Sequence, residues 1–331
     1  MTFSNEPFFK KFSSNLPTFP EMEEIDKVIK KSLCSNVSIF RDTTKYLYDL
    51  GGKRIRPYLC LLVAHTFSNN LKKKIIINTA SAIELLHTSS LYHDDIIDDA
   101  NLRRNQDTAN KKFGLANSLL AGNYLYIRAF SLMQNLNKKY ASFIEESCIK
   151  LTEGEALESN LSMEEFTIES AIEIARLKTG SLFMLASYLG TSIATTNQDV
   201  AKDMALYGEN IGIVFQIMDD ILDISSNNCE KNIGQDLIGG KPSIINTLWL
   251  KSGSELAKSI FSLNKDDKSD ELISIALQEI QDSSFIEQAT KIAKKYQKKA
   301  LQYLQYAKDK SEYLNDDFFQ YLEEVTKQSI I

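Results

Sequence analysis

Apolar residues recur at helical spacing along most of the chain. In the segments 79–100 and 203–224 they fall on neighbouring turns of one face, which is the pattern of an amphipathic helix packed against a core. The segment 285–310 combines a similar apolar stripe with a basic outer face. The segment 72–80, KKKIIINTA, could instead begin as a strand, although it runs directly into a helical pattern. The pattern as a whole predicts an all-α protein.

Proline and glycine mark where the predicted helices stop. The chain of 331 residues has five prolines, and none of them lies between Tyr58 and Lys241. Because proline removes a backbone donor and clashes with the preceding turn, such a stretch favours helices. The segment 225–243 is rich in serine, asparagine and glycine, and it is the clearest predicted loop. We expect residues 1–20 to form a flexible lead-in and residues 21–331 to form a single all-α domain.

The composition is that of an ordinary globular protein, with 43% hydrophobic and 25% charged residues. A formal net charge of −6 argues against nucleic acid as the main partner. We expect no transmembrane segment, because no apolar run approaches the roughly 20 residues that cross a bilayer. The first residues also lack the pattern of a signal peptide. The four cysteines are scattered, which argues against a zinc site and favours a reducing, cytoplasmic setting.

The sequence D-D-x-x-D occurs twice. The two copies consist of Asp94, Asp95 and Asp98, and of Asp219, Asp220 and Asp223. Aspartates four residues apart share a helix face, and each copy ends an apolar helical segment. Unpaired charge is costly at such a position, both because it lies beside a core and because the helix dipole disfavours it. Divalent cations offset these costs, and Mg²⁺ in particular completes its shell with substrate phosphates.

Basic residues accompany both aspartate clusters. They are Arg103 and Arg104 after the first cluster, Lys53, Arg54 and Arg56 in the segment GGKRIRP, and Lys178, Lys231 and Lys241 elsewhere. Arginine binds phosphate oxygens through two parallel hydrogen bonds, whereas lysine acts as a point charge. Any one of these residues could be an ordinary surface cation, and a single D-D-x-x-D could be a solvated acidic patch. Their combination in an acidic protein favours a substrate that carries a diphosphate.

The ordered motifs between residues 45 and 305 resemble those of the trans-isoprenyl diphosphate synthases, also called polyprenyl synthetases. The motifs are GGKRIRP, ELLHTSSLYHDDIIDDANLRR, KTGSLF, GIVFQIMDDILDI and GQDLIGGKPS. The resemblance implies an all-α isoprenoid synthase helical bundle around a deep central cavity, and a homodimer. It implies a magnesium-dependent prenyltransferase of isoprenoid biosynthesis that joins isopentenyl diphosphate to an allylic diphosphate, such as farnesyl diphosphate, and releases pyrophosphate.

The resemblance also implies a role for each matching residue. The metal ligands would be Asp94, Asp98 and Asp219, with Asp95, Asp220 and Asp223 in or near the same shell of three Mg²⁺ ions, which Mn²⁺ could replace. The allylic diphosphate would be held by Arg103, Lys178 and Lys241, and isopentenyl diphosphate by Lys53, Arg56, His87 and Arg104. Further substrate contacts would come from Thr179 and Gln216, beside the reacting end of the allylic chain, and from Lys231. The catalytic set would be Asp94, Asp95, Asp98, Asp219, Lys178 and Gln216.

Four positions depart from the usual pattern of the family. Asn105 stands where glycine usually follows the arginine pair, and Asn123 where aspartate is common. Glu158 stands where glutamine often occurs, and Ser243 replaces a threonine at the end of the last motif. None of these changes removes a charged ligand of the two aspartate clusters, but they leave the fine geometry of the site open.

The residues before the first cluster suggest a medium- or long-chain product. Short-chain members of the family close the cavity floor with aromatic residues at the positions of Ser89 and Ser90, and Ile83 and Leu86 lie further back. Two small serines would let an apolar chain grow along the helix, for instance toward the all-trans side chain of a quinone that is handed on to a membrane. A short-chain synthase, making farnesyl or geranylgeranyl diphosphate, is the alternative.

Other kinds of protein also fit parts of the pattern. A terpene cyclase shares the helical fold and one aspartate-rich motif, but it usually lacks a second D-D-x-x-D and the residues that bind a second diphosphate. A regulatory subunit of a heteromeric synthase generally loses its aspartates, whereas this chain keeps all six. The catalytic subunit of a heteromer stays open as an alternative to the homodimer.

Overall fold

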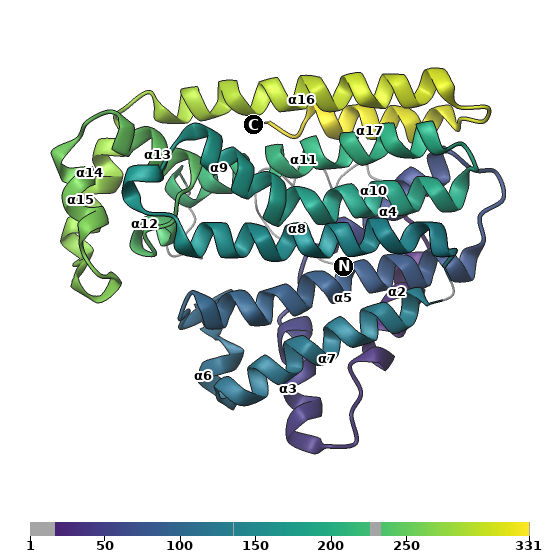
Figure 1. The fold of residues 1–331 in the computed structure, drawn as a ribbon, viewed down its shortest axis with the longest axis horizontal. Coiled ribbons are helices and arrows are strands. Elements are labelled where there is room, and N and C mark those ends of the chain that lie inside the picture. Colours follow the sequence, from purple (N-terminus) through teal and green to yellow (C-terminus); the bar gives the residue numbers. More distant parts are fainter. Residues whose placement is uncertain (1–16, 135, 226–232, 331) are drawn as a thin grey trace.

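The computed structural model describes residues 17–330, except residues 135 and 226–232, and it confirms the all-α prediction (Figure 1). The longer helices are α2 (Glu21–Ser32), α3 (Ser38–Asp49), α4 (Ile55–Thr66), α5 (Lys73–Ile97), α7 (Leu115–Met133), α8 (Ala141–Asn160), α10 (Ser181–Ala194), α11 (Gln198–Ser225), α15 (Asp270–Gln281), α16 (Phe285–Lys310) and α17 (Asp316–Lys327). The shorter helical segments are α6 (Ala109–Phe113), η1 (Lys138–Tyr140), η2 (Met163–Glu165), α9 (Ile168–Ala175), η3 (Arg176–Gly180), α12 (Gln235–Ile238), α13 (Ile244–Lys251), α14 (Glu255–Ser262) and η4 (Lys265–Asp267). Within the described residues the strands are β1 (Leu102–Arg103) and β2 (Gln106–Asp107), which pair antiparallel as a small hairpin.

The helices form a bundle in which elements distant in sequence lie side by side. α10 packs against α4, α8 and α11, while α5 packs against α2, α4 and α7. α16 runs along α11 at one side of the bundle, with α17 beside it (Figure 1). The helices α12, α13, α14 and α15 gather at one end of the molecule (Figure 1). The two helices that carry the aspartate clusters, α5 and α11, are therefore both part of the central bundle.

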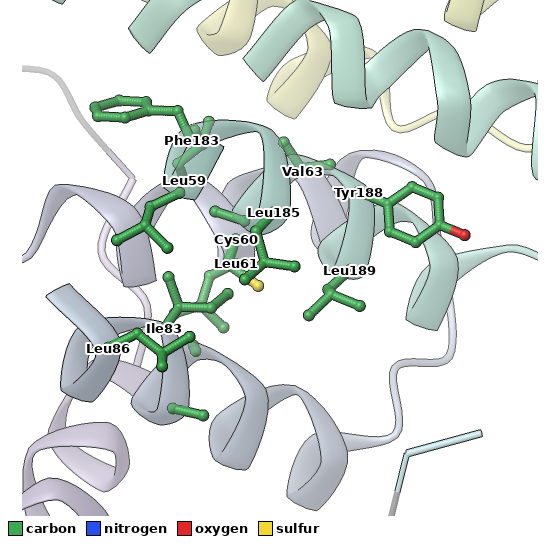
Figure 2. Packing of buried hydrophobic residues seen from close by; sticks show 14 of the residues in the cluster. Leu59, Cys60, Leu61, Val63, Ile83, Leu86, Phe183, Leu185, Tyr188 and Leu189 are labelled. Carbon is green, nitrogen blue, oxygen red and sulfur yellow. The ribbon is translucent and has the colours of Figure 1, made fainter. Parts of the chain in front are cut away.

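Two clusters of buried apolar side chains hold the bundle together. The larger one joins α4, α5 and α10, where Leu61, Ile83 and Leu185 pack together (Figure 2). The second lies between the C-terminal half of α11 and the helices α13 to α16, and it contains the fully buried Trp249. The indole nitrogen of Trp249 donates to Glu279 Oε1 at 2.8 Å, so its polar atom is satisfied. Removal of these apolar surfaces from water is the main term that stabilises the fold.

α16 shows how the sequence pattern becomes packing. The helix has the same bounds as the predicted amphipathic segment 285–310, and most of its buried positions are alanines. Small side chains on the buried face let α16 lie close to α11, against which it mainly packs. The ambiguous segment 72–80 is also helical, since α5 begins at Lys73 and continues to Ile97.

Two other predictions concern segments that the structure describes only in part. The predicted flexible lead-in, residues 1–20, falls mostly on residues 1–16, which lie outside the described residues. Its residue Phe19 is buried and stacks on His65, with ring centroids 4.9 Å apart. The predicted loop 225–243 contains the short helix α12, and its residues 226–232 also lie outside the described part. No helix in the described chain is long and apolar enough to cross a membrane.

α10 and α11 cross at close range through glycines. A Cβ atom on Gly208 would overlap the carbonyl oxygen of Phe183, and one on Gly212 would lie 2.6 Å from Gly180 Cα. Gly208 and Gly212 are four residues apart in α11, so they present one smooth strip to α10 and to the end of η3 before it. This crossing fixes how α11 presents Gln216 and the residues after it to the interior of the bundle.

The close crossing makes a stability prediction. Gly208→Ala should lower the free energy of unfolding, because the overlap with Phe183 costs about 1–3 kcal/mol and outweighs the gain of up to about 1 kcal/mol in helix propensity. Chemical denaturation followed by circular dichroism measures the change. Lys202→Ala, at an exposed position of the same helix, serves as the control and should shift the value by less than about 0.5 kcal/mol. An equal or higher stability of Gly208→Ala would contradict the packing described here.

Candidate active site

A cavity of about 1190 Å³ brings both aspartate clusters together. Its lining comes from the start of α4, from α5, from the hairpin, from η3, from α11 and from the segment that joins α12 to α13. The predicted site residues in this lining are Lys53, Arg56, His87, Asp94, Asp98, Arg103, Arg104, Lys178, Thr179, Gln216, Asp219, Asp220 and Lys241. Asp95 and Asp223 are not among the lining residues, and Lys231 lies outside the described residues.

The end of α5 forms one acidic wall of the cavity. Asp94 and Asp98 lie one turn apart and both line the cavity. Burial, together with the neighbouring Glu155, raises the pKa of Asp94 to about 7. Asp98 accepts a hydrogen bond from Lys241 Nζ at 2.7 Å, which links this wall to the segment before α13. In the described structure this wall therefore already binds one cationic group, the ammonium group of Lys241.

Asp95 supports the wall from behind. Its side chain is fully buried, and its Oδ1 accepts from Arg103 Nε at 2.8 Å. Burial raises the pKa of Asp95, although Arg103 opposes that shift. The ion pair orients the Arg103 guanidinium at the cavity. Asp95 is placed to position this arginine, whereas the sequence pattern grouped it with the metal ligands.

The end of α11 forms the opposite acidic wall. Asp219 is exposed to the cavity, and Asp220 is buried beside it. Asp220 accepts from Gln216 Nε2 at 2.9 Å and from the backbone N–H of Ile244 at 2.9 Å. Burial and the charge of Asp219 nevertheless raise the pKa of Asp220 to about 7. Asp220 thus ties the first turn of α13 to this wall.

Asp223 has a different environment from the two aspartates before it. Its carboxylate accepts from the backbone N–H groups of Gln235 and Asp236, each at 3.1 Å. These are the first residues of α12, so Asp223 satisfies donors that a helix start leaves without partners. The contact explains why part of the predicted loop 225–243 folds into a helical turn next to the cavity.

The carboxylates of the two walls fit a hard divalent cation. Asp94 and Asp220 have pKa values of about 7, so without a cation each would take up a proton near neutral pH. Carboxylate oxygens of Asp98, Glu155 and Glu158 also lie within 4.8 Å of one another, although Lys178 and Lys241 already pair with these three residues. An all-oxygen donor set at the wall of a cavity is what Mg²⁺ and similar ions prefer.

Two arginines of the motif GGKRIRP have different environments. Arg54 donates to Glu84 at 2.7 Å, and its guanidinium lies 3.9 Å from the centroid of the Tyr48 ring. Arg56 lines the cavity and is almost fully buried, which lowers its pKa to about 10. Its Nε has no hydrogen-bond partner among the described residues. A buried guanidinium with an unsatisfied donor is suited to an anionic ligand. Arg54 therefore stabilises the loop, whereas Arg56 is available to a ligand.

His87 lies among these arginines and is neutral. Burial lowers its pKa well below the usual range, and Arg56, Arg103 and Arg104 add to the effect. A neutral imidazole at this position can still donate one hydrogen bond and accept another. The side chain can therefore contact a phosphate group without adding charge to the cluster of arginines.

The hairpin after α5 places Arg104 over Gly51 and Gly52, the two glycines of the motif GGKRIRP. Arg104 and Asn105 have φ values of 53° and 60°, so both adopt the left-handed conformation of a type I′ turn. Asparagine tolerates this conformation better than most residues, which explains how Asn105 replaces the usual glycine. The Arg104 guanidinium donates to the carbonyl of Gly51 and lies against Gly52, where a side chain would crowd it.

The π-helical turn η3 inserts Lys178 and Thr179 into the cavity. Such turns are rare and are often found at functional sites. Thr179 Oγ1 donates to Gln216 Oε1 at 2.7 Å, and Gln216 continues the chain of hydrogen bonds to Asp220. Lys178 Nζ pairs with Glu155 and Glu158, each at 2.5 Å. Burial lowers the pKa of Lys178, but the carboxylates around it, led by Glu158, more than reverse that effect.

Three acidic residues of the site were not assigned from the sequence. Asp236 lines the cavity, and burial with the charges of Asp223 and Asp220 raises its pKa well above the usual value. Asp236 lies in the motif GQDLIGGKPS, and this motif is the sequence feature from which its place in the site could be predicted. Glu155 and Glu158 come from α8, and Glu158 was noticed only as a departure from the family pattern.

The other two departures have simple structural consequences. Ser243 is the N-cap of α13, and its Oγ accepts from the Asn246 N–H at 3.3 Å, as a threonine would. Asn123 contacts His93 and is not among the residues that line the cavity. Neither change alters a charged group of the two walls.

Comparison with known proteins assigns the chain to a family. A family model described as "Polyprenyl synthetase" matches residues 37–280. The chain belongs to the polyprenyl synthetase family. It is therefore a prenyltransferase, and the resemblance found in the sequence is confirmed.

The relatives of this polyprenyl synthetase differ in the product that their names state. "Octaprenyl diphosphate synthase" of Escherichia coli (strain K12) is 33% identical over 69% of this chain and 71% of its own length. "Geranylgeranyl diphosphate synthase" of Sulfolobus acidocaldarius is 30% identical over 88% of this chain and 91% of its own length. A crystal structure of polyprenyl synthase from Caulobacter crescentus CB15, complexed with calcium and isoprenyl diphosphate, matches with a TM-score of 0.82 and 26% identity, covering 97% of this chain and 96% of that one. The family is thus established, and the chain length of the product is not.

Proposed function

We propose that this polyprenyl synthetase condenses isopentenyl diphosphate with an allylic diphosphate, such as farnesyl diphosphate, to give an all-trans product of medium or long chain. The observation that supports this most is the shared cavity, in which the two acidic walls and two separate groups of basic residues meet. Two diphosphate groups need two sets of cations. One set would be Arg103, Lys178 and Lys241, and the other Lys53, Arg56 and Arg104.

The first set would hold the allylic diphosphate beside the acidic walls. Arg103 and the two lysines would neutralise the pyrophosphate as the carbon–oxygen bond breaks and an allylic cation forms. We assign Mg²⁺ to the aspartates, three ions per site with Mn²⁺ as a substitute, and such ions when bound add stabilisation of the same negative charge. Thr179 and Gln216 would place the negative ends of their dipoles near the developing cation.

The second set would hold isopentenyl diphosphate with its double bond toward that cation. Arg56 and Arg104 would bind phosphate oxygens, and neutral His87 would add a hydrogen bond without further charge. The double bond then attacks the allylic carbon, and loss of a proton completes the new prenyl unit. The released pyrophosphate, which the first set of basic residues would hold in the same cavity, would accept this proton.

The apolar part of the cavity would protect the cation from water. Leu182, Phe215 and Ile174 line it. Phe215 lies next to Gln216 in α11, and Ile174 and Leu182 lie in the helices directly before and after η3. A water molecule close to the allylic cation would convert it to an alcohol. The same apolar surface would bind the growing chain, since each buried CH₂ group contributes about 0.8 kcal/mol.

The two serines before the first cluster have different environments. Ser90 lines the cavity, whereas Ser89 is fully buried and its Oγ donates to the carbonyl of Gly122 in α7 at 2.8 Å. Leu86 and Ile83 are buried in the core (Figure 2). The small side chain of Ser90 is thus the feature that supports a product longer than farnesyl diphosphate. A short-chain product, as named for the geranylgeranyl relative, stays the alternative.

An exposed apolar face on α7 supports a homodimer. The face consists of Leu115, Leu119, Leu120, Ile127 and Phe130. These positions cover one side of the helix, and the only charged residue of α7 is Arg128. A second copy of the chain would cover this face with an identical one, as two-fold symmetry requires.

The purified chain should form prenyl diphosphates when it is incubated with Mg²⁺, isopentenyl diphosphate and farnesyl diphosphate. Chromatography of the dephosphorylated products gives their length, and addition of EDTA should abolish the reaction. Omission of isopentenyl diphosphate should also abolish it, which separates a synthase from a terpene cyclase. If the chain alone is inactive under these conditions, the homodimeric synthase proposed here is wrong. That result would favour the alternative, in which the chain is the catalytic subunit of a heteromer.

Ser90→Phe should shorten the product, because the ring would block the cavity next to the acidic wall of α5. The variant is compared with Ser90→Ala, which keeps the space open and should leave the product length unchanged. Ser89→Phe should lower stability instead, because Ser89 contacts the backbone of α7. Equal product lengths for Ser90→Phe and the wild type would refute the role of this position.

Ile127→Glu should convert a dimer into monomers. Ile127 has 66% of its surface exposed, so a charge there does not disturb the core of one chain but is costly in an apolar interface. Light scattering after size-exclusion chromatography measures the mass. Lys138→Glu, a charge change outside the apolar face, is the control. An unchanged mass for Ile127→Glu would show that α7 is not the interface.

A further inference from the structure

Glu158 lies between the two lysines that the proposed function assigns to the allylic diphosphate. Its Oε2 is 2.5 Å from Lys178 Nζ and 3.6 Å from Lys241 Nζ. The side chain is only 15% exposed, so solvent screens these contacts weakly. Among the described carboxylates that pair with these lysines, Glu155 contacts Lys178 and Asp98 contacts Lys241, whereas Glu158 contacts both.

A carboxylate oxygen between two ammonium groups resembles a phosphate oxygen in the same place. Both are anionic acceptors, and both form charge-assisted hydrogen bonds with lysine. A diphosphate that binds Lys178 and Lys241 must therefore compete with Glu158, or bind beside it against its negative charge. Either way, the charge on Glu158 opposes binding of the diphosphate.

Glu158 is not required to keep either lysine paired. Lys178 retains Glu155 at 2.5 Å, and Lys241 retains Asp98 at 2.7 Å, if the charge of Glu158 is removed. No buried lysine would then be left without a counter-charge. A neutral glutamine at this position has the same shape and can still accept a hydrogen bond, so the substitution isolates the effect of the charge.

We propose that Glu158 is a positioning residue that acts as an internal competitor of the diphosphate. Its carboxylate holds Lys178 and Lys241 together in the enzyme without substrate, and it weakens the binding of the allylic diphosphate and of the pyrophosphate that is released. Repeated condensation requires that pyrophosphate leaves after each step, and the competing carboxylate favours its departure. This inference rests on the proposed function, because it takes the two lysines as the diphosphate site.

Titration with inorganic pyrophosphate in EDTA tests the competition without turnover or metal. Isothermal calorimetry of Glu158→Gln should give a dissociation constant roughly tenfold lower than that of the wild type, as expected for the loss of one close opposing charge. Glu153→Gln removes the same charge from an exposed position of α8 and should bind like the wild type. An affinity of Glu158→Gln equal to or weaker than that of the wild type overturns the inference.

Steady-state kinetics with Mg²⁺ distinguishes competition at this site from a general effect of charge. Glu158→Gln should lower KM for the allylic diphosphate and strengthen inhibition by pyrophosphate, while KM for isopentenyl diphosphate stays unchanged. The reason is that Glu158 pairs with Lys178 and Lys241, both of which are assigned to the allylic diphosphate. A parallel change in both KM values overturns the inference.

Lys241→Met separates failure of this inference from failure of the proposed function. Loss of pyrophosphate binding in Lys241→Met, with no effect of Glu158→Gln, would refute the competition but keep the diphosphate site. Unchanged pyrophosphate binding in Lys241→Met would refute the diphosphate site and with it both proposals. Thermal unfolding of each variant shows whether the variant is folded. In a folded variant, a change of affinity reports on the site and not on loss of the fold.

Discussion

The candidate active site depends on how negative charge is balanced at the ends of two apolar helices. α5 and α11 carry carboxylates to the edge of a hydrophobic core, where desolvation opposes ionisation and raises the pKa of Asp94 and of Asp220 to about 7. Several neighbouring elements contribute to the balance. Lysines and arginines, backbone N–H groups and, in the proposed function, metal ions all neutralise this charge. The site is thus a set of charges that the fold holds close together.

Backbone geometry decides which groups take part in this balance. The π-helical turn η3 places Lys178 and Thr179 in the cavity, and the type I′ turn at Arg104 and Asn105 brings the hairpin over the loop before α4. The starts of α12 and α13 supply N–H groups to Asp223 and Asp220. Short segments with unusual conformations therefore orient side chains that the long helices only bring near.

The packing of the long helices supports the site without forming it. Glycines in α11 allow α10 to approach, and alanines in α16 allow α16 to cover the other side of α11. Since α11 is fixed from both sides, Gln216 and the aspartates after it have little freedom to move away from the opposite wall. Rigid support of this kind is what electrostatic stabilisation of a reacting group requires.

The sequence alone determined the all-α class, the helix 285–310 and the family, because helical periodicity and ordered motifs are local features that the printed residues carry. Most of the site residues that it predicted also line one cavity in the structure. It did not separate Asp95, which orients Arg103, from the aspartates that face the cavity, and it did not reveal that Glu158 bridges Lys178 and Lys241. It likewise treated Ser89 and Ser90 alike, although only the second lines the cavity. These distinctions depend on the direction of each side chain and on contacts between segments far apart in the chain, which only the tertiary structure decides.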